Sequence, residues 1–512
     1  MSILDRATVV TDFVRMHAGE QPALWFEGRE VSYATLDERS NRCAQALLAA
    51  GVAPGDRVAA LAKNCDEFAV LWFGAMKVRA CTVPVNTRLS AAEIASILGN
   101  AGASMLFVGP EFIAMLPAIR DACPGLRRVV ALESEFESWI DGYAATDPRL
   151  AADPEDDIVQ LYTSGTTGLP KGVPLTHTNF IGQLRSGSQQ EFGAWEAGSS
   201  SLIALPVFHV AGAVSLQFAM LHGARAVMVR DIVPPEMARL IGEQRINYAF
   251  LTPTVIHFLL AVPGIEGSDF SSLRHIFYGA SPISEDLLKR AMARFPCPFS
   301  QVYGMTEATG VVTSLPPERH VPGKLLSCGQ PVPGVELRIV DANGRDVPQG
   351  AVGEVTVRAA FVMRGYWNQP DATAAVLDAD GWYRTGDAGW LDEDGDLFIH
   401  DRIKDMIVSG GENVYPAEVE NALAGHPDIF EVAVIGVPDD RWGESVKAIV
   451  VPKPGAAQDP ESVIAWARAR IGGFKVPKSV DFVEAMPRNA TGKVLRRVLR
   501  EPYWAGSGRR VA

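Results

Sequence analysis

The sequence contains few cysteines and none in a pair typical of metal binding or redox chemistry. Six cysteines are scattered over 512 residues, and no two of them form a CxxC motif. This spacing is typical of reduced thiols and argues against a disulfide framework or a zinc site. We therefore expect structural thiols and a cytoplasmic protein. The cysteines are Cys43, Cys65, Cys81, Cys123, Cys297 and Cys328.

An excess of positive charge is also missing. The chain has 47 Lys and Arg against 60 Asp and Glu, which gives a formal net charge of −13 at pH 7. A dedicated nucleic-acid-binding protein usually shows a basic patch, so we expect no nucleic-acid partner. Small anionic ligands remain compatible with this charge, because a few Lys, Arg and backbone N–H groups can bind a phosphate locally.

Long uninterrupted apolar runs are absent as well. The N-terminal segment lacks the apolar core and small-residue cleavage site of a signal peptide. The most apolar stretch, Ser201–Val229, is broken by polar residues, so it predicts a buried strand followed by a buried helix. We expect no integral membrane association. The interrupting residues are Pro206, His209, Gln217, His222 and Arg225.

The pattern of strands and helices predicts an α/β fold with two domains. A chain of this length usually exceeds one hydrophobic core. From Arg57 to about Ser300, short apolar runs such as Met105–Val108 and Tyr248–Leu251, which read as buried strands, alternate with helical patterns. This alternation predicts parallel or mixed sheets flanked by helices. A hairpin pattern after Gln330 predicts a β-rich subdomain. We expect a large N-terminal domain, residues 1–403, and a small mobile α+β C-terminal domain, residues 404–512.

The most informative segment is Tyr162–Gly172, with the sequence YTSGTTGLPKG. Its glycines allow close backbone approach to a ligand, and its hydroxyls and lysine can surround a polyphosphate. It is not a Walker A loop, because no GK[ST] closes the spacing. On composition alone, a flexible surface loop is an equal alternative. The candidate ligands are Thr163, Ser164, Gly165, Thr166, Thr167, Gly168 and Lys171.

Five further motifs follow along the chain. They are YGMTE at Tyr303–Glu307, YRTGD at Tyr383–Asp387, DRIKDMI at Asp401–Ile407, SGGENVYPAE at Ser409–Glu418 and PRNATGK at Pro487–Lys493. Together with the glycine-rich loop, they resemble in order the motifs of the adenylate-forming superfamily, which includes acyl-CoA synthetases, adenylation domains and luciferases. The resemblance covers nearly the whole chain. It implies an AMP- and pyrophosphate-forming acid–CoA ligase that uses ATP, Mg²⁺ and coenzyme A.

The resemblance also assigns roles to residues at the matching positions. Lys493 is implied to stabilise charge during adenylate formation, and Lys404 to be the hinge between the domains. Thr163 and Glu307 are implied to hold Mg²⁺ through oxygen atoms. The pair Gly410–Gly411 is implied to line the tunnel for the pantetheine of CoA. The residues implied to bind ATP or AMP, besides the loop, are Gly279, Ala280, Ser281, Tyr303, Gly304, Thr306, Asp387 and Arg402.

The sequence indicates the carboxylic acid substrate less clearly than the nucleotide site. The segment Pro206–Gly212 resembles the aromatic-gate motif of the superfamily, with His209 at the acyl site and no acid–base role. It lacks the Asp that amino-acid-activating members carry, so an α-amino acid is disfavoured. We favour a medium- or long-chain fatty acid, with a hydroxycinnamate or other aryl acid, and a carrier-protein acceptor, as alternatives. A homodimer is left open. The expected pocket residues are His209, Ala211, Gly212, Met305 and Val311.

Overall fold

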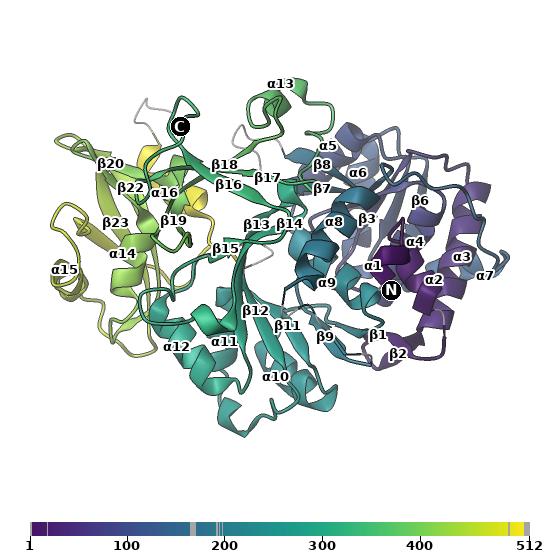
Figure 1. Cartoon of the computed structure of the whole chain (residues 1–512), viewed down its shortest axis with the longest axis horizontal. Coiled ribbons are helices and arrows are strands. Elements are labelled where there is room, and N and C mark those ends of the chain that lie inside the picture. The colour runs from purple at the N-terminus through teal and green to yellow at the C-terminus, as the bar shows by residue number, and fades with distance from the viewer. Residues whose placement is uncertain are drawn as a thin grey trace.

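The computed structural model describes residues 3–17, 19–163, 170–190, 193, 195–196, 198–489 and 492–505, with the backbone alone at Lys404. Within these ranges no helix combines the length and the apolar character that a bilayer crossing requires. The cysteines are free, and five of the six are buried. Figure 1 shows two large sheets, a smaller sheet above their junction, and a final unit at the left that carries the C-terminal part of the chain.

The first large sheet has the strand order β6-β5-β3-β4-β7-β8. Neighbours pair in parallel except β7 and β8, which are antiparallel. Alternate residues of β3 enter different apolar clusters, because successive side chains of a strand point to opposite faces. The strands are β3 (Arg57–Leu61), β4 (Cys81–Pro84), β5 (Met105–Val108), β6 (Arg128–Ala131), β7 (Asp157–Thr163) and β8 (Lys171–Thr176).

Helices cover both faces of this sheet. Val58 and Ala60 of β3 belong to the cluster that contains α3 and α4, whereas Ala59 and Leu61 belong to the cluster that contains α5. Each helix therefore buries its apolar stripe against one face. The helices of this region are α1 (Ile3–Arg6), α2 (Asp12–His17), α3 (Tyr33–Ala49), α4 (Asp66–Lys77), α5 (Ala91–Ala101), α6 (Leu116–Ala122) and α7 (Phe136–Asp141).

The second large sheet has nine strands in the order β15-β14-β13-β12-β11-β9-β10-β1-β2. Its central strands are parallel, and antiparallel pairs close both edges. The strands are β1 (Pro22–Phe26), β2 (Arg29–Ser32), β9 (Ser200–Ile203), β10 (Arg225–Met228), β11 (Tyr248–Leu251), β12 (His275–Gly279), β13 (Phe299–Met305), β14 (Gly310–Leu315) and β15 (Gln330–Pro331). Its helices are α8 (His177–Ser188), α9 (Val210–Leu221), α10 (Pro234–Glu243), α11 (Pro253–Leu260) and α12 (Glu285–Arg294).

Two smaller sheets complete the molecule. An antiparallel sheet in the order β16-β17-β18-β19 precedes a five-stranded sheet, in which β24 is parallel to β23. The elements are β16 (Glu336–Val340), β17 (Gly353–Arg358), α13 (Pro370–Ala374), β18 (Tyr383–Leu391), β19 (Leu397–Arg402), β20 (Ile407–Ser409), β21 (Glu412–Val414), α14 (Pro416–Leu423), β22 (Ile429–Asp439), β23 (Gly443–Pro452), α15 (Pro460–Arg468), β24 (Ser479–Phe482) and α16 (Arg496–Trp504).

The expected α/β fold with mixed sheets is confirmed. The apolar runs expected at Met105–Val108 and Tyr248–Leu251 are strands with those bounds. The stretch Ser201–Val229 contains most of β9, all of α9 and β10, and its polar interruptions, except Gln217 inside α9, lie at or between the boundaries of these elements. The hairpin pattern after Gln330 is the antiparallel pair β16–β17.

Candidate active site

A cleft of about 780 Å³ lies between the second large sheet and the final unit of the chain. One wall comes from the ends of β12 and β13 and from α11, and the other from β19, α14, β22 and the segment before α16. In Figure 1 this is the region between the teal strands and the yellow-green unit. Its volume lies within the range of about 300–1,000 Å³ that is common for small-molecule sites.

The carboxyl ends of β12 and β13 bring two glycines and Ala280 to the wall of the cleft. A Cβ on Gly279 would lie 2.0 Å from the carbonyl oxygen of Val302, and one on Gly304 would lie 1.8 Å from that of Gly310. Both positions therefore require glycine. Ala280 has a φ of 65°, a left-handed conformation that is uncommon for residues other than glycine. This backbone presents a flat edge to the cleft, which a planar base can approach.

A hydrogen-bonded chain of three side chains lies beside this wall. Tyr303 donates to Asp387 Oδ2 at 2.5 Å, and Arg402 Nε lies 2.7 Å from Asp387 Oδ1. Asp387 and Arg402 face each other across β18 and β19. Burial and the Asp387 charge raise the pKa of Tyr303 well above its usual value, so Tyr303 stays a neutral donor. Although burial opposes the charged form, Asp387 raises the pKa of Arg402.

A second carboxylate, Glu307, is held at the junction of the two large sheets. Thr163 Oγ1, at the end of β7, lies 3.4 Å from Glu307 Oε1, and Tyr366 donates to the same oxygen at 3.0 Å. Glu307 is buried in the turn between β13 and β14. Lys171 Nζ, at the start of β8, lies 4.6 Å from the centre of the Tyr366 ring. The tertiary fold thus brings the glycine-rich segment and Tyr366, which lies in no recognised motif, to the carboxylate of the YGMTE motif.

Lys493 extends into the cleft from the final unit. Its backbone N–H donates to Asn489 Oδ1 at 2.9 Å. Its side chain lines the cleft, where it keeps contact with solvent although protein walls surround it. Burial by the surrounding walls and the charge of Arg402 lower the pKa of Lys493. The side chain that carries this amine therefore lies near the Asp387–Arg402 pair.

The loop that carries Lys493 is docked on α11. Thr254 Oγ1 donates to the carbonyl of Gly492 at 3.1 Å, and Arg488 Nη1 donates to Thr254 Oγ1 at 3.2 Å. Arg488 also pairs with Glu431 at 2.6 Å, while Arg88 of the N-terminal part donates to the carbonyl of Arg488 at 3.2 Å. These contacts hold the loop at the cleft.

Gly410 and Gly411 lie at the turn between β20 and β21. Their φ values of 63° and 87° favour glycine in this tight turn. Neither glycine lines the cleft. Gly410 donates its N–H to the carbonyl of Trp442, and a Cβ at this position would lie 2.7 Å from the Trp442 ring. Lys404 lies in the short helix η6 (Ile403–Asp405), directly after β19.

A narrow apolar cavity of about 160 Å³ opens beside the cleft. Ala280 and Gly304 line both spaces. The far end of the cavity is closed by Trp195, which stacks on Tyr248 with ring centres 4.1 Å apart and contacts Phe218 edge-on at 5.0 Å. Ala211 and Val311 line this cavity as expected.

The other expected pocket residues lie outside the cavity lining. Met305 is packed in the core, and a Cβ on Gly212 would lie 2.3 Å from the carbonyl oxygen of Pro206, so this glycine serves backbone packing. His209 precedes α9 as its N-cap residue and lines neither space. Burial lowers its pKa to about 4, so its imidazole is neutral at neutral pH.

Most of the expected nucleotide site converges. Gly279, Ala280, Ser281, Tyr303, Gly304, Asp387, Arg402 and Lys493 border one cleft or adjoin its wall. Thr306 follows β13 as the first residue of η4 (Thr306–Ala308), and Thr163, Lys171 and Glu307 gather at the sheet junction. Ser164, Gly165, Thr166, Thr167 and Gly168 lie outside the described residues.

Sequence reasoning missed several residues of these sites. Tyr366 shares Glu307 with Thr163, and Arg488 docks the Lys493 loop, although it lies inside a recognised motif. Gln183 and Trp195 line the apolar cavity. A spacing signal existed for Gln183 alone, because Gln183 and Gly187 lie four residues apart, and so on one face of α8.

Comparison with known proteins now identifies the family. The model of the AMP-binding enzyme family matches residues 11–367, and that of the AMP-binding enzyme C-terminal domain matches residues 418–493. The chain therefore belongs to the AMP-binding enzyme family. The expectation of an adenylate-forming acid–CoA ligase is confirmed at this level.

The alignments with individual relatives cover nearly the whole chain. A fatty acid–[acyl-carrier-protein] ligase, ScoC of Streptomyces coeruleorubidus, is 42% identical over 98% of this chain and 97% of its own. A feruloyl-CoA synthase of an Amycolatopsis species is 39% identical over 93% and 94%. The crystal structure of the anthranilate CoA ligase AuaEII in complex with anthranoyl-AMP superposes with a TM-score of 0.92 at 28% identity, covering 99% of this chain and 100% of that chain.

Proposed function

We propose that this enzyme activates a medium-chain fatty acid with ATP and transfers the acyl group to the thiol of coenzyme A. The observation that carries the proposal is the apolar cavity, which opens on the nucleotide cleft beside Ala280 and Gly304 and ends at Trp195 and Tyr248. An acid bound there would direct its carboxylate toward the cleft and bury its chain. Burial of each methylene contributes about 0.8 kcal/mol to binding.

The depth of the cavity limits the length of the acid. On its sheet side the cavity extends from Ala280 to Tyr248. Tyr248 pairs with His275 of the neighbouring strand β12, and the five residue steps from His275 to Ala280 span about 16 Å. On its helix side, Val210 to Phe218 spans about 12 Å. An extended chain advances about 1.2 Å per bond. The cavity therefore suits about ten carbons, which favours a medium-chain acid over a long-chain one.

In the first half-reaction, the carboxylate oxygen of the acid attacks the α-phosphorus of ATP and pyrophosphate leaves. Lys493 reaches the cleft and would neutralise the charge that develops on the α-phosphoryl oxygens. Asp387, fixed by Tyr303 and Arg402, would accept hydrogen bonds from the ribose hydroxyls. The flat edge at Ala280 would bind the adenine.

The family implies a magnesium ion, and the chain offers a fitting donor set. The Thr163 hydroxyl and the Glu307 carboxylate supply oxygen atoms, which a hard cation prefers. Tyr366 orients the same carboxylate from the opposite side of the junction. When bound, the ion would offset the negative charge of the ATP phosphates.

In the second half-reaction, the thiol sulfur attacks the carbonyl carbon of the acyl-adenylate, AMP leaves, and the thiol proton passes to solvent. We assign the domain boundary and hinge to Lys404, with residues 1–403 and 404–512 as the moving bodies. Rotation there would withdraw Lys493 and bring Gly410 and Gly411 to the cleft. Their position away from the cleft supports assigning the described arrangement to adenylate formation.

Two alternatives have specific support. The 42% identity to a fatty acid–[acyl-carrier-protein] ligase favours the pantetheine of a carrier protein as a second candidate acceptor. The 39% identity to a feruloyl-CoA synthase, together with Phe250 and Phe277 in the cavity wall, favours an aryl acid as the second candidate substrate.

A pyrophosphate-release screen tests the proposal. The panel comprises butanoic, octanoic, decanoic, dodecanoic and hexadecanoic acids, with ferulic, benzoic and dicarboxylic acids, and amino acids as controls. Each acid is offered with CoA and, separately, with a phosphopantetheinylated carrier protein. We expect the highest kcat/KM near decanoic acid. A preference for hexadecanoic acid or for an aryl acid would contradict the assigned acid, and thioester formation on the carrier alone would contradict CoA as the acceptor.

A further inference from the structure

A buried glutamine stands in the mostly apolar wall of the apolar cavity beside the cleft. Gln183, on α8, is 3% exposed and lines the cavity, yet its amide oxygen is buried without a hydrogen-bond partner among the described residues. No hydrogen bond of its amide nitrogen is found within that part of the chain either. A buried unpartnered polar group destabilises a fold, so its presence at a ligand cavity points to a partner supplied by the ligand.

The position of Gln183 along the length of the cavity follows from the residues that it contacts. A Cβ on Gly310 would lie 3.5 Å from both the amide carbon of Gln183 and a methyl group of Val214. Gly310 packs directly on Gly304, which lines the cleft. Gln183 therefore lies in the half of the cavity nearer to the reacting carboxylate.

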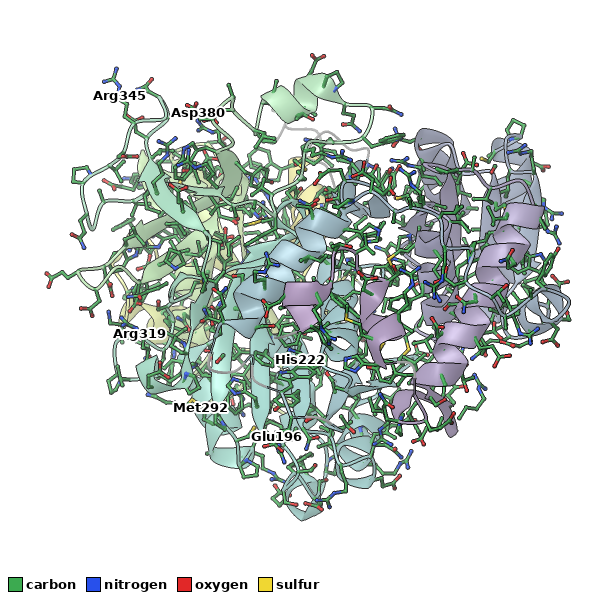
Figure 2. The ribbon with its side chains drawn as sticks, turned by 45° about the vertical axis from the view of Figure 1, so that its right-hand side comes forward. Glu196, His222, Met292, Arg319, Arg345 and Asp380 are labelled. Atoms are coloured by element: carbon green, nitrogen blue, oxygen red, sulfur yellow. The ribbon has the colours of Figure 1, made fainter. Side chains whose placement is uncertain are left out.

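The next turn of α8 lies deeper. Gly187, one turn after Gln183, contacts Phe218, since a Cβ there would lie 3.0 Å from that ring. Phe218 in turn contacts Trp195, which closes the cavity. Figure 2 labels His222, which follows α9 and stacks on Trp195 with ring centres 5.6 Å apart, so this residue marks the closed end. The walls beyond Gln183 thus contain several aromatic rings, together with the polar residues Gln190 and Ser201.

We propose that Gln183 determines specificity for acids that carry a hydroxyl or carbonyl oxygen on the first half of the chain. This inference rests on the proposed fatty-acid function and narrows it to oxygenated acids. The unpartnered amide oxygen can accept from such a hydroxyl as it stands, and after the amide group turns over, its N–H₂ can donate to a hydroxyl or carbonyl oxygen. A plain chain leaves the amide unpartnered and therefore binds less tightly.

The test compares kcat/KM for pyrophosphate release with decanoic, 3-hydroxydecanoic, 5-hydroxydecanoic and 10-hydroxydecanoic acids. For the wild type we expect the 3- or the 5-hydroxy acid to exceed decanoic acid by about five- to tenfold, the effect of one neutral hydrogen bond. Any gain with the 10-hydroxy acid, whose hydroxyl would lie at the far end beside Gln190 and Ser201, should be unaffected by substitution of Gln183. Gln183→Leu, or Gln183→Met as a second variant of similar size, should abolish the preference.

Gln217 provides a matched control. It is a fully buried glutamine of α9 whose amide atoms also have no partner among the described residues, but it does not line the cavity. Gln217→Leu should leave the preference for hydroxy acids intact. Equal kcat/KM for decanoic and both hydroxy acids in the wild type would overturn the role of Gln183 alone. Absence of pyrophosphate release with every straight-chain acid would overturn the proposed fatty-acid function as well.

Discussion

At the scale of single residues, charge in the cleft is arranged around one buried carboxylate. Asp387 accepts from Tyr303 and pairs with Arg402, so its negative charge is already balanced before a nucleotide arrives. Lys493 lies near this pair, and within the described part of the chain its amine forms no ion pair with a carboxylate. A mobile cation that is not bound to a carboxylate can interact with developing phosphoryl charge at little cost in broken ion pairs.

Lys493→Ala should reduce adenylate formation by about a hundred- to a thousandfold, because loss of one preorganised charge-stabilising group commonly has this effect. Thioester formation from preformed acyl-adenylate should be nearly unchanged, since the role of Lys493 is confined to the first half-reaction. Single-turnover assays of each half-reaction measure the two effects separately.

Lys453 is a suitable control for that variant. It lines the same cleft, and its amine donates to the backbone carbonyl of Pro427. Lys453→Ala should leave both half-reactions within about twofold of wild type, an effect of well under 1 kcal/mol. Equal losses of both half-reactions in Lys493→Ala would refute the assignment of this lysine to adenylation.

At the scale of elements, the final unit is anchored to the rest of the chain on two sides of the proposed hinge. Asp401, at the end of β19, pairs with Arg496 of α16 at 3.0 Å, and it accepts from the N–H of Ala417 at 3.2 Å. On α11, His257 packs against Phe430 of β22 with ring centres 4.5 Å apart. These contacts must break when the unit rotates about Lys404.

Lys404→Pro should trap the enzyme in the adenylate-forming arrangement. Proline fixes φ near −65° and removes a backbone N–H, so it restricts the rotation that the hinge requires. We expect acyl-adenylate to accumulate to a normal burst while thioester formation falls at least about tenfold, which corresponds to about 1.4 kcal/mol in the barrier. Rapid-quench measurement of the bound adenylate and of the thioester tests this. Normal overall turnover would argue against a hinge at Lys404.

Arg488→Ala is expected to have the opposite effect and is therefore the contrasting variant. Removing the guanidinium releases Thr254 and Glu431 and weakens docking of the Lys493 loop on α11. Adenylate formation should slow, whereas transfer from preformed acyl-adenylate should be unchanged. A shared defect in both half-reactions would indicate general loss of structure instead of lost docking.

Element prediction from the sequence succeeded where the pattern is local. The strands at Met105–Val108 and Tyr248–Leu251 are apolar throughout, because parallel strands are covered on both faces. Such an uninterrupted apolar run can be recognised in the sequence alone. Mixed sheets were expected, but the sequence did not locate antiparallel pairs such as β13–β14 and β7–β8, because pairing direction depends on how a turn folds back and not on apolar spacing.

At the scale of the whole molecule, four histidines are kept neutral by burial. Burial lowers the pKa of each of them to about 4: His177, His209, His222 and His275. His177 accepts the N–H of Val10 through Nδ1 at 3.0 Å, a bond that one ring nitrogen can make only without its proton. The folded state therefore binds fewer protons than the unfolded state below about pH 6.5.

Stability should consequently fall as the pH drops. A group whose folded pKa is depressed contributes stability that is present above its unfolded pKa and is lost as the pH falls toward its folded pKa. Between about pH 6.5 and 4, each histidine should contribute a loss of about 1–2 kcal/mol by pH 5. Urea unfolding midpoints at pH 7.5, 6 and 5 measure this effect.

A single variant identifies the cause of that loss. His177→Asn preserves an acceptor for the Val10 N–H but removes the titrating group. Its urea midpoint should fall less steeply between pH 6.5 and 5 than that of wild type. A wild-type midpoint independent of pH over this window would contradict the four-histidine explanation.

The sequence by itself determined the class of enzyme and predicted most of the residues that the fold brings to the cleft. Motifs such as Tyr383–Asp387 and Pro487–Lys493 are short and contiguous, so they can be recognised from the sequence without knowledge of the fold. The tertiary structure alone decided that Tyr366 shares Glu307, that Arg488 holds the Lys493 loop on α11, and that Gln183 faces a cavity closed by Trp195. The reason is physical: these contacts join segments far apart in the chain, and their partners are chosen by packing and not by spacing.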